Sequence, residues 1–77
     1  MIHIGKKIEE AFVKRGCTKT WLAEQINCDH SNINHIFKRK SMDAELLLRI
    51  SNALSVNFFA YYVAQLTYDK DSQNNGE

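Results

Sequence analysis

The chain has 77 residues, of which 44% are hydrophobic and 25% are charged, and its formal net charge is +1. A chain of this length forms one small domain with a thin core, which excludes a deep catalytic cleft between domains. It contains no apolar run long enough for a membrane span and no signal-peptide pattern at its start, so we expect a cytoplasmic protein.

Apolar residues at helical spacing predict five short helices, and no segment alternates as a strand would. The expected ranges are about 3–15, 19–26, 30–39, 44–54 and 58–67. Gly16 and Asn27 follow the first two ranges and accept the left-handed backbone that ends a helix. The predicted N-caps of the last four ranges are Thr18, Asp29, Asp43 and Asn57. The fold class is therefore all-α.

Charge divides the chain into two parts. Residues 1–68 contain nine Lys and Arg against six Asp and Glu, a net charge of +3, and we take them as the folded domain. Residues 69–77 are polar with a net charge of −2, and we expect a disordered tail there. Basic clusters in a small domain are compatible with nucleic-acid binding, but a solvated surface has the same composition.

The segment CDHSNINHIFKRK, residues 28–40, predicts a helix with two different faces. At about 100° per residue, Ile33, Ile36 and Phe37 fall on one arc and would pack on the core. The opposite arc carries His30, Ser31, Asn34, His35 and Lys38.

Metal binding and catalysis are poor explanations of this polar arc. His30 and His35 are five residues apart, which places them at opposite edges of the arc, whereas a helical metal pair needs a spacing of four. Cys17 and Cys28 cannot close a zinc site by themselves, and we expect them to be small apolar fillers. Nothing aligns a nucleophile with a base. We therefore expect no metal, no cofactor and no enzymatic activity.

The polar side chains of this arc are suited to binding DNA bases. Asn, His and Ser side chains can hydrogen-bond to base edges, and an α-helix fits the major groove. The three consecutive cations at the end of the range, Lys38, Arg39 and Lys40, would meet phosphates. An ordinary exposed helix face is also polar, but here amides, imidazoles and a hydroxyl stand in place of Glu and Lys. This composition favours base reading.

The second and third ranges have the spacing of a helix-turn-helix at about 19–39. That motif needs a small residue where the helices cross, an apolar residue in the turn and an apolar residue facing back from the second helix. Ala23, Cys28 and Ile33 stand at these three offsets.

With the segments IGKKI, KRGCTKTWLAEQI and LLLRISNALSV, the chain resembles the Cro/C1-type helix-turn-helix domain of phage-repressor-like and XRE-like bacterial regulators. The resemblance covers Ile4 to about Leu66. The part from IFKRKSMDAELLLRISNAL to FFAYY is similar to small stand-alone regulators of Bacteroides-type bacteria. The resemblance implies a lambda-repressor-like fold whose third helix enters the major groove of double-stranded DNA.

Site residues follow from the resemblance by position. His30 and Ser31 would be the first base-reading residues, Asn34 and His35 the later ones, and Asn32 would meet the backbone from the edge. Backbone contacts are further implied for Lys19 and Thr20, at the start of the second helix, and for the cations Lys38, Arg39 and Lys40.

Three positions depart from the family pattern. Lys19 stands where glutamine is frequent, and Asn27 stands where the turn glycine is expected. Asp29 replaces the usual Ser or Thr before the third helix, and its carboxylate near DNA phosphates is unfavourable unless it only caps that helix.

Aromatic residues gather at the end of the domain, in the stretch FFAYY at residues 58–62. Phe59, Tyr62, Val63 and Leu66 share one face and are predicted to join the core. One short helix cannot bury all of these aromatic rings, so the remainder predicts a partner surface. We expect a homodimer through Phe58, Tyr61, Tyr62 and Gln65, which would read a pseudo-palindromic operator.

The sequence thus favours a sequence-specific DNA-binding transcriptional regulator that acts as a repressor. The alternative is a protein-interaction module on the same fold, such as an antitoxin that binds a partner protein through the aromatic C-terminal helix.

Overall fold

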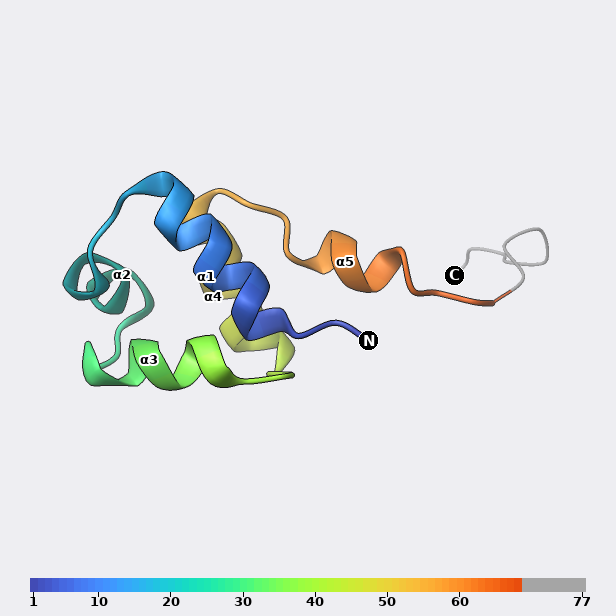
Figure 1. Cartoon of the computed structure of the whole chain (residues 1–77), viewed down its shortest axis with the longest axis horizontal. Coiled ribbons are helices and arrows are strands. Elements are labelled where there is room, and N and C mark those ends of the chain that lie inside the picture. The colour runs from blue at the N-terminus through green and yellow to red at the C-terminus, as the bar shows by residue number, and fades with distance from the viewer. Residues whose placement is uncertain (69–77) are drawn as a thin grey trace.

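The computed structural model describes residues 1–68, and within them it contains five helices and no strand (Figure 1). The helices are α1 (Ile4–Arg15), α2 (Lys19–Ile26), α3 (Ser31–Lys38), α4 (Ala44–Leu54) and α5 (Phe59–Val63). The all-α prediction is confirmed, and the first four helices begin and end within one residue of the predicted ranges. The tail predicted for residues 69–77 lies outside the described residues.

Four of the ten helix ends within residues 1–68 are set by the residues that the sequence identifies. Gly16 and Asn27 adopt the left-handed backbone, with φ angles of 77° and 60°. The side chains of Thr18 and Asp43 each accept a hydrogen bond from the amide three residues later, at 3.0 and 3.2 Å. A cap of this kind stabilises a helix by about 0.5–2 kcal/mol, because it pairs an N–H that the helix itself leaves open.

Two predicted N-caps are wrong. α3 begins after His30 and α5 after Phe58, one residue later than expected, and neither cap residue makes a side-chain capping bond. The backbone closes these first turns instead, since the carbonyl oxygens of Asp29 and Asn57 accept an N–H from three residues later, at 3.0 and 3.2 Å. The Asp29 carboxylate is therefore not used as a cap.

Two helix ends have a residue that the sequence did not single out. His3 is the N-cap of α1, and its Nδ1 accepts the backbone N–H of Lys6 at 3.2 Å. Ser55 follows α4 with a left-handed φ of 57°. Neither residue type is a strong predictor of its position, because N-caps favour Ser, Thr, Asp and Asn over His, and the left-handed position after a helix favours Gly and Asn over Ser.

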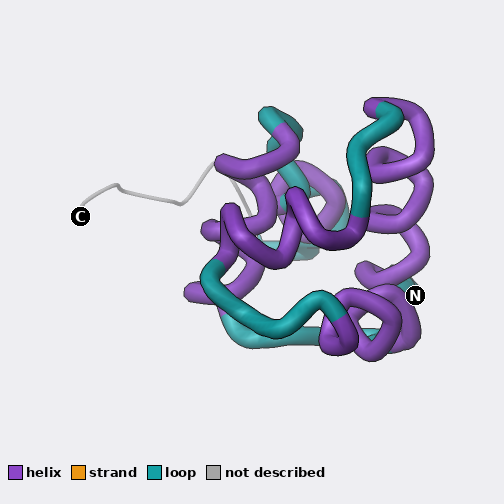
Figure 2. Tube along the Cα trace, turned by 90° about the vertical axis from the view of Figure 1, so that its left-hand side faces the viewer, coloured by secondary structure: helices purple, strands orange, loops and turns teal. Residues whose placement is uncertain are grey.

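Apolar side chains of α1 to α4, together with Phe58, form one core. Its members are Ile4, Ile8, Phe12, Leu22, Ala23, Ile26, Ile33, Ile36, Phe37, Leu47, Ile50, Leu54 and Phe58. α1 and α2 both pack against α3 and α4, so these helices surround a common centre in the view of Figure 2. The rings of Phe12 and Phe37, with centroids 5.1 Å apart, join α1 to α3.

The start of α1 lies so close to the end of α3 that no side chain fits at Gly5. The Gly5 N–H donates to the Arg39 carbonyl at 2.9 Å. A Cβ at Gly5 would lie 2.6 Å from the carbonyl oxygens of Ile36 and Arg39, and closer still to that of Phe37. This contact fixes the point at which the basic segment 38–40 leaves α3.

Arg15 connects three helices. Its guanidinium lies 4.9 Å from the centre of the Trp21 ring in α2, and its Nη1 donates to the Leu54 carbonyl at the end of α4, at 3.5 Å. A stacked cation near a helix C-terminus is favourable on both counts, because the ring face and the open carbonyls are negative. Arg15 therefore has a structural role, because its contacts join α1 to α2 and α4.

α5 differs most from the prediction. It ends at Val63, four residues earlier than expected, and none of its own residues is buried. The predicted core face is wrong for Tyr62, Val63 and Leu66, which are 37%, 54% and 48% exposed, whereas Phe59 packs partly buried against the core. Phe58, predicted for a dimer surface, is 0% exposed. The physical reason is position. α5 lies beside the four-helix body at the end opposite α2 (Figure 1). Phe58, just before α5, is therefore the residue of this region that is buried in the core.

Candidate nucleic-acid interface

The junction of α2 and α3 is a tight four-residue connection, residues 27–30. The Cys28 N–H donates to the Ala23 carbonyl at 2.9 Å, which is possible because Asn27 before it is left-handed. Ala23 and Ile33 are 3% and 0% exposed, and Cys28 is half-buried against the core. The burial predicted for these three residues is confirmed, and it holds α3 at a fixed position against α2.

α3 has the two faces that its sequence predicts. Ile33, Ile36 and Phe37 are buried in the core. The other five residues of the helix are all exposed, and they are Ser31, Asn32, Asn34, His35 and Lys38. This face thus carries a hydroxyl, two amides, an imidazole and an ammonium group, and no carboxylate.

The five remaining predicted residues, which are His30, Arg39, Lys40, Lys19 and Thr20, extend this face or lie on α2. All ten predicted residues are exposed: Lys19, Thr20, His30, Ser31, Asn32, Asn34, His35, Lys38, Arg39 and Lys40. Eight of them fall between residues 30 and 40, so α3 and its two flanks bring them together. The other two occupy the first turn of α2, a helix that packs against α3.

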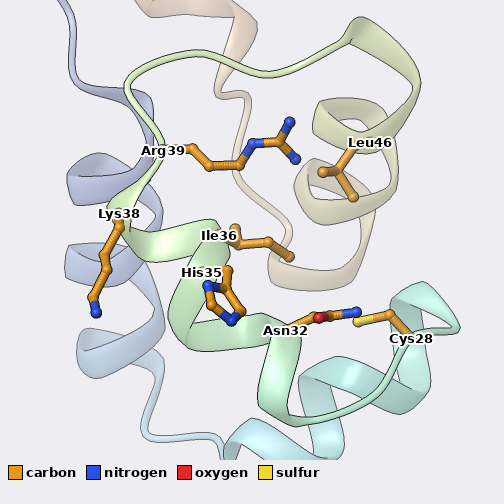
Figure 3. Close-up of a pocket in the computed structure, with 7 residues that line it drawn as sticks. All are labelled: Cys28, Asn32, His35, Ile36, Lys38, Arg39 and Leu46. Atoms are coloured by element: carbon orange, nitrogen blue, oxygen red, sulfur yellow. The ribbon is translucent and has the colours of Figure 1, made fainter.

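A pocket of about 530 Å³ separates the exposed face of α3 from α4 (Figure 3). In Figure 3 the Asn32 side chain points towards Cys28, and Arg39 points towards Leu46 of α4. Lys38 points away from α4 on the other side of α3. Asn32 and Arg39 therefore form the α4-side edge of the exposed face.

A second hollow, of about 460 Å³, lies between α1 and α3. Its lining residues are His3, Lys6, Glu9, Asn34, Phe37 and Lys38. The three α1-side residues were not candidates from the sequence, and no local signal marks them. They border the exposed face of α3 only because the packing of α1 on α3 places them there.

Asp29 and Cys28 form a pair directly before α3. The Cys28 Sγ donates to the Asp29 carbonyl at 3.4 Å, and both cysteines of the chain are free thiols. Burial, and secondly the Asp29 charge, raise the pKa of the Cys28 thiol above its usual value. Because the carboxylate is exposed and caps nothing, it places a negative charge beside the start of the polar face.

Within residues 1–68, no three His, Cys, Asp or Glu side chains lie close enough together to hold a metal ion. None of the five described helices is both long and apolar enough to cross a membrane.

Comparison with known proteins gave no match: no family model, no curated protein and no solved structure matches the chain. Function has to be inferred from the residues and their geometry.

Proposed function

We propose that the chain is a sequence-specific DNA-binding transcriptional regulator that acts as a repressor, on a lambda-repressor-like, Cro/C1-type fold. In this proposal α2, the connection 27–30 and α3 are a helix-turn-helix, and α3 enters the major groove. The observation that carries it is the division of α3: three apolar residues are fixed in the core, and the five exposed ones are all able to bind bases or phosphates.

The dimensions of α3 agree with this role. Eight residues at 1.5 Å each give a helix about 12 Å long, and a helix with side chains is about 10–12 Å across, close to the ~12 Å width of the major groove. At a rise of about 3.4 Å per base pair, one α3 spans three to four base pairs. Asn34 and His35 would read base edges at its centre, with Ser31 and His30 nearer its start.

Phosphate contacts would come from both ends of the motif. Lys38, Arg39 and Lys40 would meet the backbone beyond the end of α3. Lys19 and Thr20 would do so at the start of α2, where the open N–H groups of a helix attract anions. Asp29 opposes binding, since its carboxylate lies next to the first base-reading residues.

Three to four base pairs are too few for a specific operator, so the proposal includes a homodimer on a pseudo-palindromic site with half-sites about 34 Å apart. Tyr62, Val63 and Leu66 are 37%, 54% and 48% exposed and give the dimer an apolar surface at α5. Of the residues first expected there, Tyr61, Tyr62 and Gln65 remain, with Tyr61 only partly exposed, and the buried Phe58 does not.

The same exposed apolar residues favour a second candidate function, that of a protein-interaction module such as an antitoxin. In that case the surface at α5 binds a different protein, and DNA binding is secondary. The two candidates differ in what the isolated chain does with DNA.

Selection from random double-stranded DNA by the purified chain tests the proposal. We expect enrichment of a consensus with two inverted half-sites of three to four base pairs. The absence of any enrichment would contradict the regulator and favour the interaction module. Sedimentation of the chain alone at high concentration tests the dimer, and a monomer there argues against it.

Variants of α3 test the groove assignment. Asn34→Ala and His35→Ala should each relax the preference at one base pair, by about 1–3 kcal/mol. Lys38→Ala should weaken all sequences equally and reduce the salt slope by about 1. Lys14→Ala is the matched control, because this lysine is exposed at the far end of α1. If the α3 variants behave like the control, α3 does not bind DNA.

A further inference from the structure

The hollow between α1 and α3 brings cations from two separate segments to the edge of the proposed DNA-reading face. Lys6 of α1 and Lys38 of α3 both line it, together with the His3 ring and the Asn34 amide. Asn34 belongs to the exposed face of α3, so a DNA strand that follows the rim of the major groove would pass along this hollow. Glu9 is the one carboxylate among its lining residues.

The position of Lys6 is fixed by the docking of α1 on α3. Ile4 N–H donates to the Lys40 carbonyl at 3.3 Å, and Gly5 N–H donates to the Arg39 carbonyl at 2.9 Å. The first residues of α1 are thus bonded to the segment that carries the C-terminal cations of α3. A phosphate near Lys38 is therefore within reach of a side chain from the start of α1.

His3 offers a hydrogen-bond donor at the hollow between α1 and α3. Its Nδ1 accepts the Lys6 N–H at 3.2 Å, so in the neutral ring the proton resides on Nε2. The ring lines the hollow, and an Nε2–H can donate to a phosphate oxygen. The same side chain would thereby cap α1 and contact DNA.

We propose that the start of α1 is a further DNA-backbone contact, in which Lys6 and His3 bind a phosphate next to Lys38 and Glu9 limits the affinity. The inference rests on the proposed function, because it requires α3 in the major groove. It adds a phosphate-binding point that lies outside both helices of the motif.

Lys6→Ala and Lys14→Ala separate this contact from the general charge of α1. Both remove one exposed lysine from the same helix. Lys6→Ala should weaken binding about three- to tenfold and lower the slope of log K against log salt by about 0.9, as one lost phosphate contact requires. Lys14→Ala should leave the slope unchanged. Equal effects of the two variants would overturn the inference.

Glu9 and Glu10 give a second matched pair with the opposite sign. Both are exposed, but Glu9 lines the hollow beside α3, whereas Glu10 lines a neighbouring hollow beside α5, which His3 and Lys6 also border but no residue of α3 does. Glu9→Gln should strengthen DNA binding about two- to fivefold at low salt, since a charge about one Debye length or less from a phosphate is incompletely screened. Glu10→Gln should change it less than about twofold. If Glu10→Gln tightens DNA binding, or if Glu9→Gln does not tighten it, the DNA strand does not pass along the hollow between α1 and α3.

His3→Asn isolates the second role of His3. Asparagine is a good N-cap, so the melting temperature should stay unchanged, while the shorter side chain loses the Nε2 donor and binding falls about two- to threefold. Unchanged binding would limit His3 to capping. Lys38→Ala, measured in parallel, distinguishes failure of this inference from failure of the groove assignment of α3. If it weakens binding and the α1 variants do not, the inference fails alone, and if it has no effect either, the groove assignment of α3 fails with it.

Discussion

Replacement of Gly5 by alanine should destabilise the domain, although the same change in most helices is stabilising. Alanine exceeds glycine in helix propensity by about 1 kcal/mol, so α1 considered by itself would become more stable. In the structure the new Cβ would lie 2.6 Å from the carbonyl oxygens of Ile36 and Arg39. The obstacles are backbone atoms, which cannot rotate away as a side chain would.

The magnitude follows from what must move. Overpacking costs about 1–3 kcal/mol. Separation of α1 from the end of α3 weakens two hydrogen bonds, from Ile4 to Lys40 and from Gly5 to Arg39, each worth about 0.5–1.5 kcal/mol. After subtraction of the propensity gain, Gly5→Ala should lower the free energy of unfolding by about 1–5 kcal/mol. For a domain of this size each kcal/mol lost lowers the melting temperature by about 4–8 °C.

Thermal and urea unfolding followed by helical circular dichroism measure this loss. Lys14→Ala, in the same helix but exposed, should stay within about 0.5 kcal/mol of the original chain. A Gly5→Ala chain that is as stable as the original, or more so, would refute the close contact between α1 and the end of α3.

Further predictions concern the core, the turn and the start of α3. Ile33→Ala, at a fully buried position, should cost about 2–5 kcal/mol in urea unfolding. Phe58→Ala should cost about 3–5 kcal/mol by the same measurement, and a loss below about 1 kcal/mol would contradict its place in the core. Asn27→Gly should leave stability nearly unchanged, whereas Asn27→Ala should lose about 1 kcal/mol, because φ there is 60°. Asp29→Asn should leave the melting temperature unchanged and tighten DNA binding in titrations. It should also speed alkylation of Cys28 by iodoacetamide at pH 8, since removal of a charge that raises the thiol pKa increases the thiolate fraction. Unchanged alkylation would show that burial alone sets this pKa.

Much of the fold could be predicted from local chemistry. The four longer helices follow from apolar spacing. Four of their ends follow from residues whose conformational preference is strong, namely Gly16 and Asn27 in left-handed turns and Thr18 and Asp43 as caps. The two faces of α3 follow in the same way, because Ile33, Ile36 and Phe37 recur at helical spacing. The exposure of the candidate residues of α3 could therefore be predicted from the sequence alone.

Two features of the structure could not be predicted. Asp29 looked like a cap, but the first turn of α3 is closed by the backbone, so its carboxylate stays an unused negative charge. The periodicity of residues 59–66 predicted a buried face, but α5 lies beside the body, so Phe58 is buried and Phe59 and Tyr61 pack against the core only partly buried. A helical pattern says which side chains share a face, and it does not say whether another element is there to cover that face.

The sequence by itself determined the elements of this protein and the chemistry of the α3 surface, because those depend on residues a few positions apart. The tertiary structure decided which surfaces lie next to one another. It placed Gly5 against the end of α3, which brings Lys6 and His3 to the edge of the exposed face of α3, and it left Val63 and Leu66 uncovered. Contacts of this kind join residues more than 30 positions apart, and they follow from how the helices pack on the shared core and from no local preference of the residues involved.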